Sequence, residues 1–435
     1  MAPQSGIDAT AARAGAMDRI SDFLASRAAL LRDYLTAVSG SLGRLIFSLL
    51  YFVVLANALS IAEFGLFATA SAAGVMLSRI VGFGFVSSLY RIATVKPRLL
   101  GTFAGGFLLM TALSLPVLAG ASWLTHAIFF SGELPLATFA LVIVSEALLW
   151  RLVETVVIVN NGLNRFATAA VLVIAGTALR AAAAGLFALS AAPVLGDWVY
   201  YYLAANGACL ALALAFFWPR QRLRLRPALY WSRLADALYV AGAELLFYLQ
   251  MELDKLLVLA LGGPHLAGIY AIVMRLVDLT AIPVRTFTML LVQRLMRAPE
   301  TLSRLWLRVG FEAGILAIST LGLATLALAL HFYPTILGNN VSQAAPLVIF
   351  ALAVPGLRNL IEYQAELLFA RGQMLVRALN LALLAGAKAV VLTYLLLGEP
   401  EAQQLVLMLN AAFAVLYLAS TLLTYSAIRL PARRA

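Results

Sequence analysis

The chain has 435 residues, of which 63% are hydrophobic and 12% are charged, with a mean hydropathy of +0.95. Soluble domains hold about 45–50% apolar and about 25% charged residues, so this composition excludes a water-soluble globule and indicates a membrane protein with several spans. Lys and Arg number 31 against 20 Asp and Glu, which gives a net charge of +11. In a soluble chain that excess would suggest nucleic-acid binding, so its position along the chain decides its meaning.

Residues 1–40 are predicted to form a cytoplasmic, amphipathic N-terminal segment. They contain several charged residues and lack the apolar core and cleavage site of a signal peptide. Apolar residues recur at helical spacing, which favours a helix lying in the membrane interface. A solvated amphipathic tail is the alternative. The apolar stripe consists of Phe23, Leu24, Leu31, Tyr34, Leu35 and Val38.

Hydropathy predicts an all-α membrane protein with about 12 transmembrane helices in two six-helix lobes. The spans are expected at 41–59, 64–87, 100–121, 136–158, 167–190, 199–218, 235–261, 267–289, 306–330, 343–363, 378–397 and 403–427. The N-terminal lobe covers 41–218 and the C-terminal lobe covers 235–427. A basic cytoplasmic linker at 219–234 separates them, and a basic cytoplasmic tail occupies 428–435.

The two lobes are predicted to be related by a parallel duplication. The segments 57–67 and 260–270 each end one span, turn briefly and resume with a Gly two residues before an aromatic residue. These pairs are Gly65 with Phe67, and Gly268 with Tyr270. Internal repeats of this kind are common in transporter folds.

The cation distribution predicts the orientation of the chain. With the N-terminus inside, the inner segments hold 23 of the 31 Lys and Arg residues and the outer loops hold none. Cytoplasmic loops are enriched in these residues, so both termini are expected in the cytoplasm. The net positive charge is therefore an orientation signal, and we expect no nucleic-acid partner.

Signs of catalysis or cofactor binding are missing from the sequence. Cys209 is the only cysteine, no Gly-Lys pair forms a phosphate-binding loop, and no HExxH or Cys/His cluster could hold zinc. We therefore expect no catalytic residues, no metal, no cofactor and no enzyme activity. A glycan polymerase or ligase is also disfavoured, because the longest outer loop has about 14 residues and catalysis there often needs a larger outer loop or domain.

Charges inside the spans are the functional candidates, because each costs at least ~2.5–3.5 kcal/mol at the bilayer centre and should face a cavity or a partner. The spans hold eight cations and nine acids. Three local pairs are expected to neutralise one another on one helical face: Arg151 with Glu154, Arg275 with Asp278, and Arg358 with Glu362. For these, a packing role and a ligand-binding role stay open.

Four span cations have no acid within four residues and need a partner on another helix, a phosphate or the membrane edge: Arg79, Arg180, Arg285 and Lys388. Together with Arg275 they are the predicted cavity cations. The stripe formed by Arg275, Asp278 and Arg285 on the eighth span is the best candidate for a cavity wall. Glu244, Glu252 and Asp254 on the seventh span, and Asp278, are candidates for ion coupling or for ion pairing.

Two motif regions resemble a known family. LSIAEFGLF (59–67) followed by GFGFVSSLYR (82–91), and LDKLLVLALGGPHLAGIYAIVMRL (253–276), are similar to the repeated signatures of the polysaccharide transporter family, the Wzx-type flippases of the MOP superfamily. The matching residues are Glu63, Phe64 and Gly65 in the first signature and Asp254, Gly268 and Tyr270 in the second.

The resemblance implies a MOP/MATE-like fold whose central cavity opens alternately to the two sides of a bacterial inner membrane. It implies a flippase that moves an undecaprenyl-pyrophosphate-linked oligosaccharide to the outer leaflet for O-antigen, capsule or exopolysaccharide assembly. The implied partners are this lipid-linked substrate, membrane lipids, H+ or Na+ as a coupling ion, and the polysaccharide polymerase and assembly proteins. A MATE-like, cation-coupled drug antiporter is the alternative, and it would need an acid-lined cavity.

Overall fold

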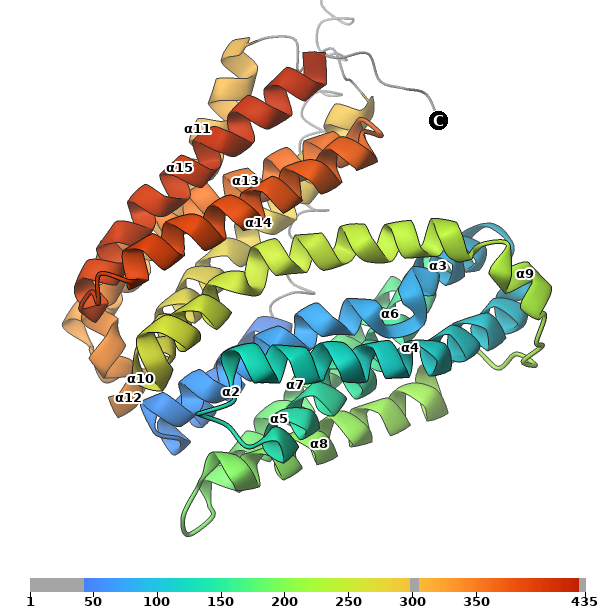
Figure 1. The fold of residues 1–435 in the computed structure, drawn as a ribbon, viewed down its shortest axis with the longest axis horizontal. Coiled ribbons are helices and arrows are strands. Elements are labelled where there is room, and N and C mark those ends of the chain that lie inside the picture. Colours follow the sequence, from blue (N-terminus) through green and yellow to red (C-terminus); the bar gives the residue numbers. More distant parts are fainter. Residues whose placement is uncertain (1–42, 298–304, 430–435) are drawn as a thin grey trace, which may run out of the picture. The chain divides into compact units, whose positions relative to one another are not determined.

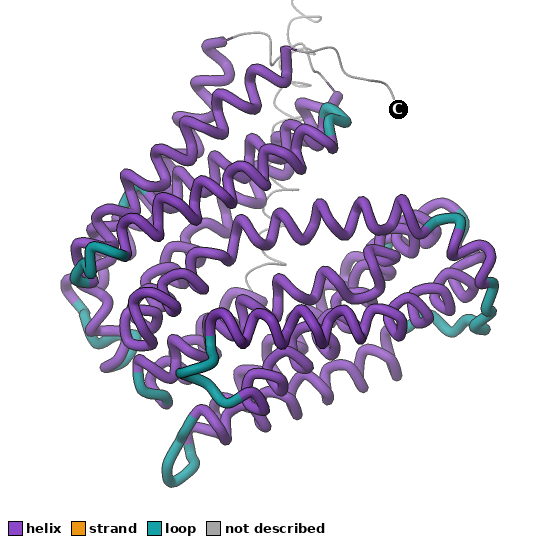
Figure 2. Tube along the Cα trace, in the orientation of Figure 1, coloured by secondary structure: helices purple, strands orange, loops and turns teal. Residues whose placement is uncertain are grey.

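The computed structural model describes residues 43–297 and 305–429, which contain helices and connecting loops but no strand (Figures 1 and 2). The predicted N-terminal amphipathic segment 1–40 lies outside the described residues, as does the tail from residue 430 on. An all-helical fold agrees with the long apolar runs of the sequence, because a helix satisfies the backbone hydrogen bonds of a membrane span within that span.

The first half of the fold contains the helices up to Phe217. It consists of a helix at Gly43–Ala58, α2 (Ile61–Leu77), η1 (Ser78–Gly84), α3 (Phe85–Val95), η2 (Pro97–Leu99), α4 (Leu100–Phe129), α5 (Leu136–Ile143), η3 (Val144–Trp150), α6 (Arg151–Gly162), α7 (Phe166–Ala188), α8 (Leu195–Leu212) and η4 (Ala213–Phe217).

The second half begins after the linker. It consists of α10 (Leu234–Arg297), α11 (Leu305–Phe332), α12 (Asn339–Ala344), η6 (Ala345–Ala351), α13 (Val354–Ala370), α14 (Met374–Leu396) and α15 (Ala402–Arg429). The predicted basic linker contains a non-helical stretch up to Arg226 and the short helix α9 (Pro227–Trp231).

Nine helices in the described ranges are long and apolar enough to cross a membrane, and the bent pair α12–η6 plus α13 is a tenth candidate. This count is lower than the predicted twelve for two reasons. The helix Gly43–Ala58 is short, and α10 is continuous by its hydrogen bonds although its backbone is non-helical at Gly263. When α10 is divided at Gly263 and the short helix is included, twelve segments follow in the predicted order, six in each half.

Glycines produce two of the breaks. Gly263 has a φ of 77°, and Gly82 and Gly84, on either side of Phe83, have φ values of 71° and 74°. Such angles are costly for residues with a Cβ and are readily adopted by glycine. The break at 82–84 falls in the GFG part of the first signature and divides the second span into α2 and α3.

The helix α10 connects the two halves. It packs along α2 in the first half and along α14 in the second half (Figure 1). A buried apolar core includes side chains from α2, α8, α10 and α13. Large apolar side chains also lie exposed on the outside of the helices, as expected where lipid chains surround a protein. The most exposed examples are Leu189, Phe216, Tyr394 and Leu422.

Candidate functional site

A cavity of about 390 Å³ lies between the two halves. Its walls come from the helix Gly43–Ala58, α2, η3, α7 and α8 on one side and from α10 on the other. Aromatic side chains form much of the lining in the first half: Tyr51, Phe52, Phe64, Phe67, Trp150 and Tyr202. The cavity therefore combines apolar ring faces with charged groups, as small-molecule sites usually do.

Seven ionisable side chains of Arg, Lys, Asp and Glu line this cavity. The cations are Arg44, Arg180, Lys255 and Arg275, and the acids are Glu146, Glu252 and Asp278. Each acid forms an ion pair with a cation, as described below. The cavity therefore presents no carboxylate without a counter-ion.

In the first half, Glu146 and Arg180 form the charged part of the wall. The Nη2 of Arg180 lies 3.4 Å from Glu146 Oε2, and its Nε donates to Asn206 Oδ1 at 2.8 Å. The guanidinium of Arg180 lies 4.0 Å above the Trp150 ring, at cation–π distance. Glu146 Oε1 accepts hydrogen bonds from Ser71 Oγ at 2.7 Å and from the Tyr202 hydroxyl.

The local helix geometry places Glu146 and Trp150 at the cavity. Both belong to η3, a π-helical stretch between α5 and α6. A π-helical turn is rare and is frequently found at functional sites.

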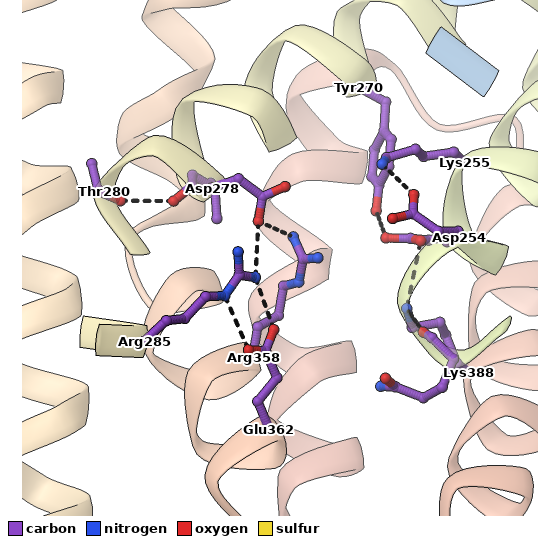
Figure 3. A network of polar contacts seen from close by, with 12 residues as sticks. Asp254, Lys255, Tyr270, Asp278, Thr280, Arg285, Arg358, Glu362 and Lys388 are labelled. Atoms are coloured by element: carbon purple, nitrogen blue, oxygen red, sulfur yellow. Dashed lines mark hydrogen bonds and ion pairs between the residues drawn. The ribbon is translucent and has the colours of Figure 1, made fainter. Parts of the chain in front are cut away.

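In the second half, Lys255 donates to Glu252 at 2.5 Å, one turn away on α10. Asp278 Oδ1 lies 3.3 Å from Arg285 and 3.4 Å from Arg358, and Glu362 binds Arg285 through two hydrogen bonds of 2.8 and 3.0 Å. Figure 3 shows Arg285 between the two carboxylates. Two acids and two arginines thus neutralise one another across α10 and α13.

Two of the predicted local pairs are wrong. Asp278 pairs with Arg285 and Arg358 instead of Arg275, and Glu362 pairs with Arg285 instead of Arg358. Side chains on α13 reach Asp278 because α10 and α13 pack together, so tertiary contacts replace the pairing within each helix. The predicted pair Arg151–Glu154 is confirmed, with an N–O distance of 2.8 Å.

Arg275 and Arg44 differ from the other cavity cations. Arg275 donates to Ser48 Oγ and, within the described parts of the chain, neither arginine forms an ion pair with a carboxylate. Ser48 lies one helical turn after Arg44 on the helix Gly43–Ala58, so the two arginines line the same part of the wall. Positive charge is therefore concentrated on this part of the wall.

Three predicted cavity cations lie outside the cavity lining: Arg79, Arg285 and Lys388. Arg79 pairs with Glu154 at 3.1 Å and lies 3.9 Å from Glu244 on α10. Lys388 is buried, lies 3.5 Å from Asp254 Oδ1 and donates to the Gln250 carbonyl. Each of the four lone span cations thus pairs with an acid on another helix. Arg285 also pairs with Asp278 on its own helix, α10.

The proposed coupling acids also have partners. Glu244 pairs with Arg151 at 3.2 Å, Glu252 with Lys255 and Asp254 with Lys388. Of these three, only Glu252 lines the cavity. All three acids are therefore ion-paired in the structure.

The signature residues lie at contacts between helices. Glu63 completes the N-terminal capping box of α2 with Ser60, and its Oε1 accepts a hydrogen bond of 3.0 Å from the Leu195 amide at the start of α8. Gly65 and Gly268 allow the backbones of α2 and α10 to approach closely. Tyr270 donates to Asp254 Oδ2 at 2.5 Å, across the Gly263 break in α10 (Figure 3).

Sequence reasoning placed Arg180, Arg275, Asp278 and Glu252 in site roles, and the structure brings these four together at one cavity. It gave no such role to Arg44, Glu146, Lys255, Trp150 and Tyr202, which also line it. Glu146 had a usable signal, because it is a span acid without a cation within four residues.

No protein-family model and no curated protein matches this chain. Solved structures do match. One is an inward-facing conformation of a multidrug resistance MATE family transporter of the MOP superfamily, with 15% identity, a TM-score of 0.60 and coverage of 89% of this chain and 95% of that one.

Two further MATE structures are similar. A complex with MaD3S has 12% identity and a TM-score of 0.56, and covers 90% of this chain and 94% of that one. A structure of MATE in the bent conformation has 14% identity and a TM-score of 0.53, and the match covers 90% of this chain and 95% of that one. The chain therefore has the fold of MATE transporters of the MOP superfamily.

Proposed function

We propose that the protein is an alternating-access flippase. Its substrate would be an undecaprenyl-pyrophosphate-linked oligosaccharide, moved from the inner to the outer leaflet of a bacterial inner membrane, with both chain termini in the cytoplasm. The observation that carries this proposal is the pairing of charged side chains in the cavity wall. Every acid in its wall is paired with a cation, whereas Arg275 and Arg44 pair with no described carboxylate. Such a wall favours an anionic ligand.

The physical need for such a protein lies in the substrate. Each unsatisfied polar group of a glycan headgroup costs several kcal/mol in hydrocarbon, so the headgroup needs a polar path while its lipid tail stays in the bilayer. A cavity of about 390 Å³ is at the small end of the ligand-site range. We infer that it holds the charged pyrophosphate region, and that a longer glycan extends beyond it.

The membrane potential can drive export of an anion. Moving negative charge outward against an inside-negative potential is downhill by ~2.3 kcal/mol per charge per 100 mV. Transport therefore needs no ATP, and coupling to H+ or Na+ would add to this driving force. Membrane lipids, a polysaccharide polymerase and assembly proteins are the expected partners of a flippase in surface polysaccharide assembly.

A MATE-like drug antiporter is the second candidate function, because the similar solved structures include a multidrug resistance transporter. A cationic drug needs an unpaired acid in the cavity. Here Glu146, Glu252 and Asp278 are each bound to a cation, and this pairing favours the flippase.

Reconstituted protein tests the proposal directly. In liposomes it should move a fluorescent undecaprenyl-pyrophosphate oligosaccharide between leaflets, and Arg275→Ala should slow the movement by about tenfold, equivalent to ~1.4 kcal/mol. Arg98→Ala is the matched control, because Arg98 is exposed in η2 and does not line the cavity. Efflux of a cationic dye without movement of the lipid would favour the antiporter and refute the flippase.

A further inference from the structure

The cavity wall contains a carboxylate, Glu146, beside Arg180, although a transporter of anions has no obvious need for a negative group there. Glu146 is buried, with 3% of its surface exposed, yet it lines the cavity together with Arg180. A negative group at this position repels an anionic substrate and competes for the arginine that could bind it. Its presence therefore needs an explanation within the proposed function.

The contacts of Glu146 divide between its two oxygens. Oε1 is held by Ser71 on α2 and by Tyr202 on α8, whereas Oε2 contacts Arg180 at 3.4 Å. The Arg180 contact is long compared with the 2.8 Å of Arg151–Glu154 and is outside the usual range of charge-assisted hydrogen bonds. The carboxylate thus keeps two strong donors when Arg180 moves away.

Arg180 is held independently of Glu146. Asn206 accepts from its Nε at 2.8 Å, and the rings of Trp150 and Tyr202 lie 4.0 and 5.0 Å from its Cζ. These neighbours keep the guanidinium at the cavity wall without using its charge in an ion pair. A small rotation of the terminal nitrogens is therefore enough to exchange one oxyanion for another.

The ion pairs of the second half are built differently. Lys255 contacts Glu252 at 2.5 Å, and Asp278 is shared by two arginines. Among the described residues, Glu252 and Asp278 accept side-chain hydrogen bonds from cationic groups alone, so neither carboxylate has a neutral donor like those on Glu146. Arg180–Glu146 is the cavity pair in which both members have other neutral partners in place.

We propose that Glu146 is an internal counter-ion that occupies Arg180 in the empty cavity, and that a phosphoryl oxygen of the substrate displaces it. This inference rests on the proposed function. Glu146 then neutralises the wall when no substrate is present. It also sets a threshold for binding, because a ligand has to bind Arg180 better than a carboxylate does. Glu146 offers Arg180 only Oε2, because its Oε1 is bound by Ser71 and Tyr202, whereas a phosphoryl group can offer two oxygens to the guanidinium.

Binding of farnesyl pyrophosphate to the purified full chain in nanodiscs tests the inference. Glu146→Gln keeps the shape and the acceptor oxygen of the side chain but removes its charge. We expect the Kd of this variant to fall by about tenfold. Glu133→Gln is the matched control, since it removes the same charge from an exposed loop, and its Kd should equal that of the wild type.

A second variant should change the Kd in the opposite direction, so the test does not depend on correct folding of Glu146→Gln alone. Ser71→Ala removes one donor from Oε1, so the carboxylate should hold Arg180 more tightly and the Kd should rise by about threefold. In an Arg180→Gln background both effects should disappear, because the competition between carboxylate and ligand requires the arginine.

The outcomes separate the two proposals. Wild-type binding together with an unchanged or higher Kd for Glu146→Gln would overturn the counter-ion role and leave the flippase proposal standing. Binding by neither protein would overturn both. Binding by Glu146→Gln alone, lost again in the double variant with Arg180→Gln, would support the counter-ion role and count against a pyrophosphate substrate for the wild type.

Discussion

The backbones of Gly65 in α2 and Gly268 in α10 pack so closely that a Cβ on Gly65 would lie 2.8 Å from the Cα of Gly268. A Cβ on Gly268 would in turn overlap the carbonyl of Ile61. Each glycine belongs to the signature of its half. The paired signatures therefore mark one contact, where the two halves of the protein meet backbone to backbone.

Alanine at either glycine should destabilise the protein. Gly268→Ala forces the two backbones apart, so we expect a loss of about 1–3 kcal/mol, visible as a lower melting temperature in detergent. Gly207→Ala in α8 is the control, because a Cβ there meets no atom within 4 Å. Equal melting temperatures for the two variants would show that the crossing tolerates a side chain.

Asn340 is predicted to hold the two halves together at the start of α12. The backbone N–H of Asn340 donates to Asn57 Oδ1 at 3.0 Å. Its side-chain Nδ2 donates to the carbonyls of Ala56 and Leu59 at 2.9 and 2.7 Å. Asn340→Ala removes two of these bonds, each worth about 0.5–1.5 kcal/mol. We expect spin labels across this contact to report a larger separated population. Asn339→Ala, at an exposed neighbour, should leave the distance distribution unchanged.

Lys388 and Asp254 should behave as a unit. Both side chains are about 1% exposed, so removal of one partner leaves an uncompensated buried charge. Lys388→Met should cost about 3–5 kcal/mol of folding stability. The double variant Lys388→Met with Asp254→Asn should be more stable than Lys388→Met alone, because it removes both charges. Additive losses in thermal unfolding would contradict this pairing.

Glu154 is expected to matter more than Glu244 for folding. Glu154 contacts both Arg79 and Arg151, whose side chains are 7% and 1% exposed, at 3.1 and 2.8 Å. Glu154→Gln should therefore cost about 3 kcal/mol. Glu244 is 40% exposed and adds longer contacts to the same arginines, so Glu244→Gln should cost less than ~1 kcal/mol. Thermal unfolding of both variants checks the order.

Much of the fold could be predicted because membrane helices are encoded locally. Apolar runs of about 20 residues identify the spans, and glycines such as Gly263 mark where the backbone must depart from a helix. The structure contains fewer separate helices than the twelve predicted spans, partly because α10 continues through its break at Gly263. The signatures at Gly65 and Gly268 indicated a duplication and a family resemblance, and only the structure revealed that the two glycines contact each other.

The partners of the buried charges could not be predicted in the same way. Arg79 and Glu154 are 75 positions apart, and Arg285 and Glu362 are 77 apart. Neighbour rules within one helix reach only three or four residues, so they gave the right partner for Arg151 and the wrong one for Arg275. The same limit left the partner of Glu146 unidentified, because Arg180 is 34 positions away.

The sequence by itself determined that the chain is an all-helical membrane protein, and which charges are enclosed among apolar residues. Both are local properties of composition and periodicity. Only the tertiary structure decided that Arg180 and Arg275 face a cavity while Lys388 is buried beside Asp254. The physical reason is that a charge in a bilayer must be compensated somewhere, and helix packing alone determines whether a carboxylate or open space lies opposite it.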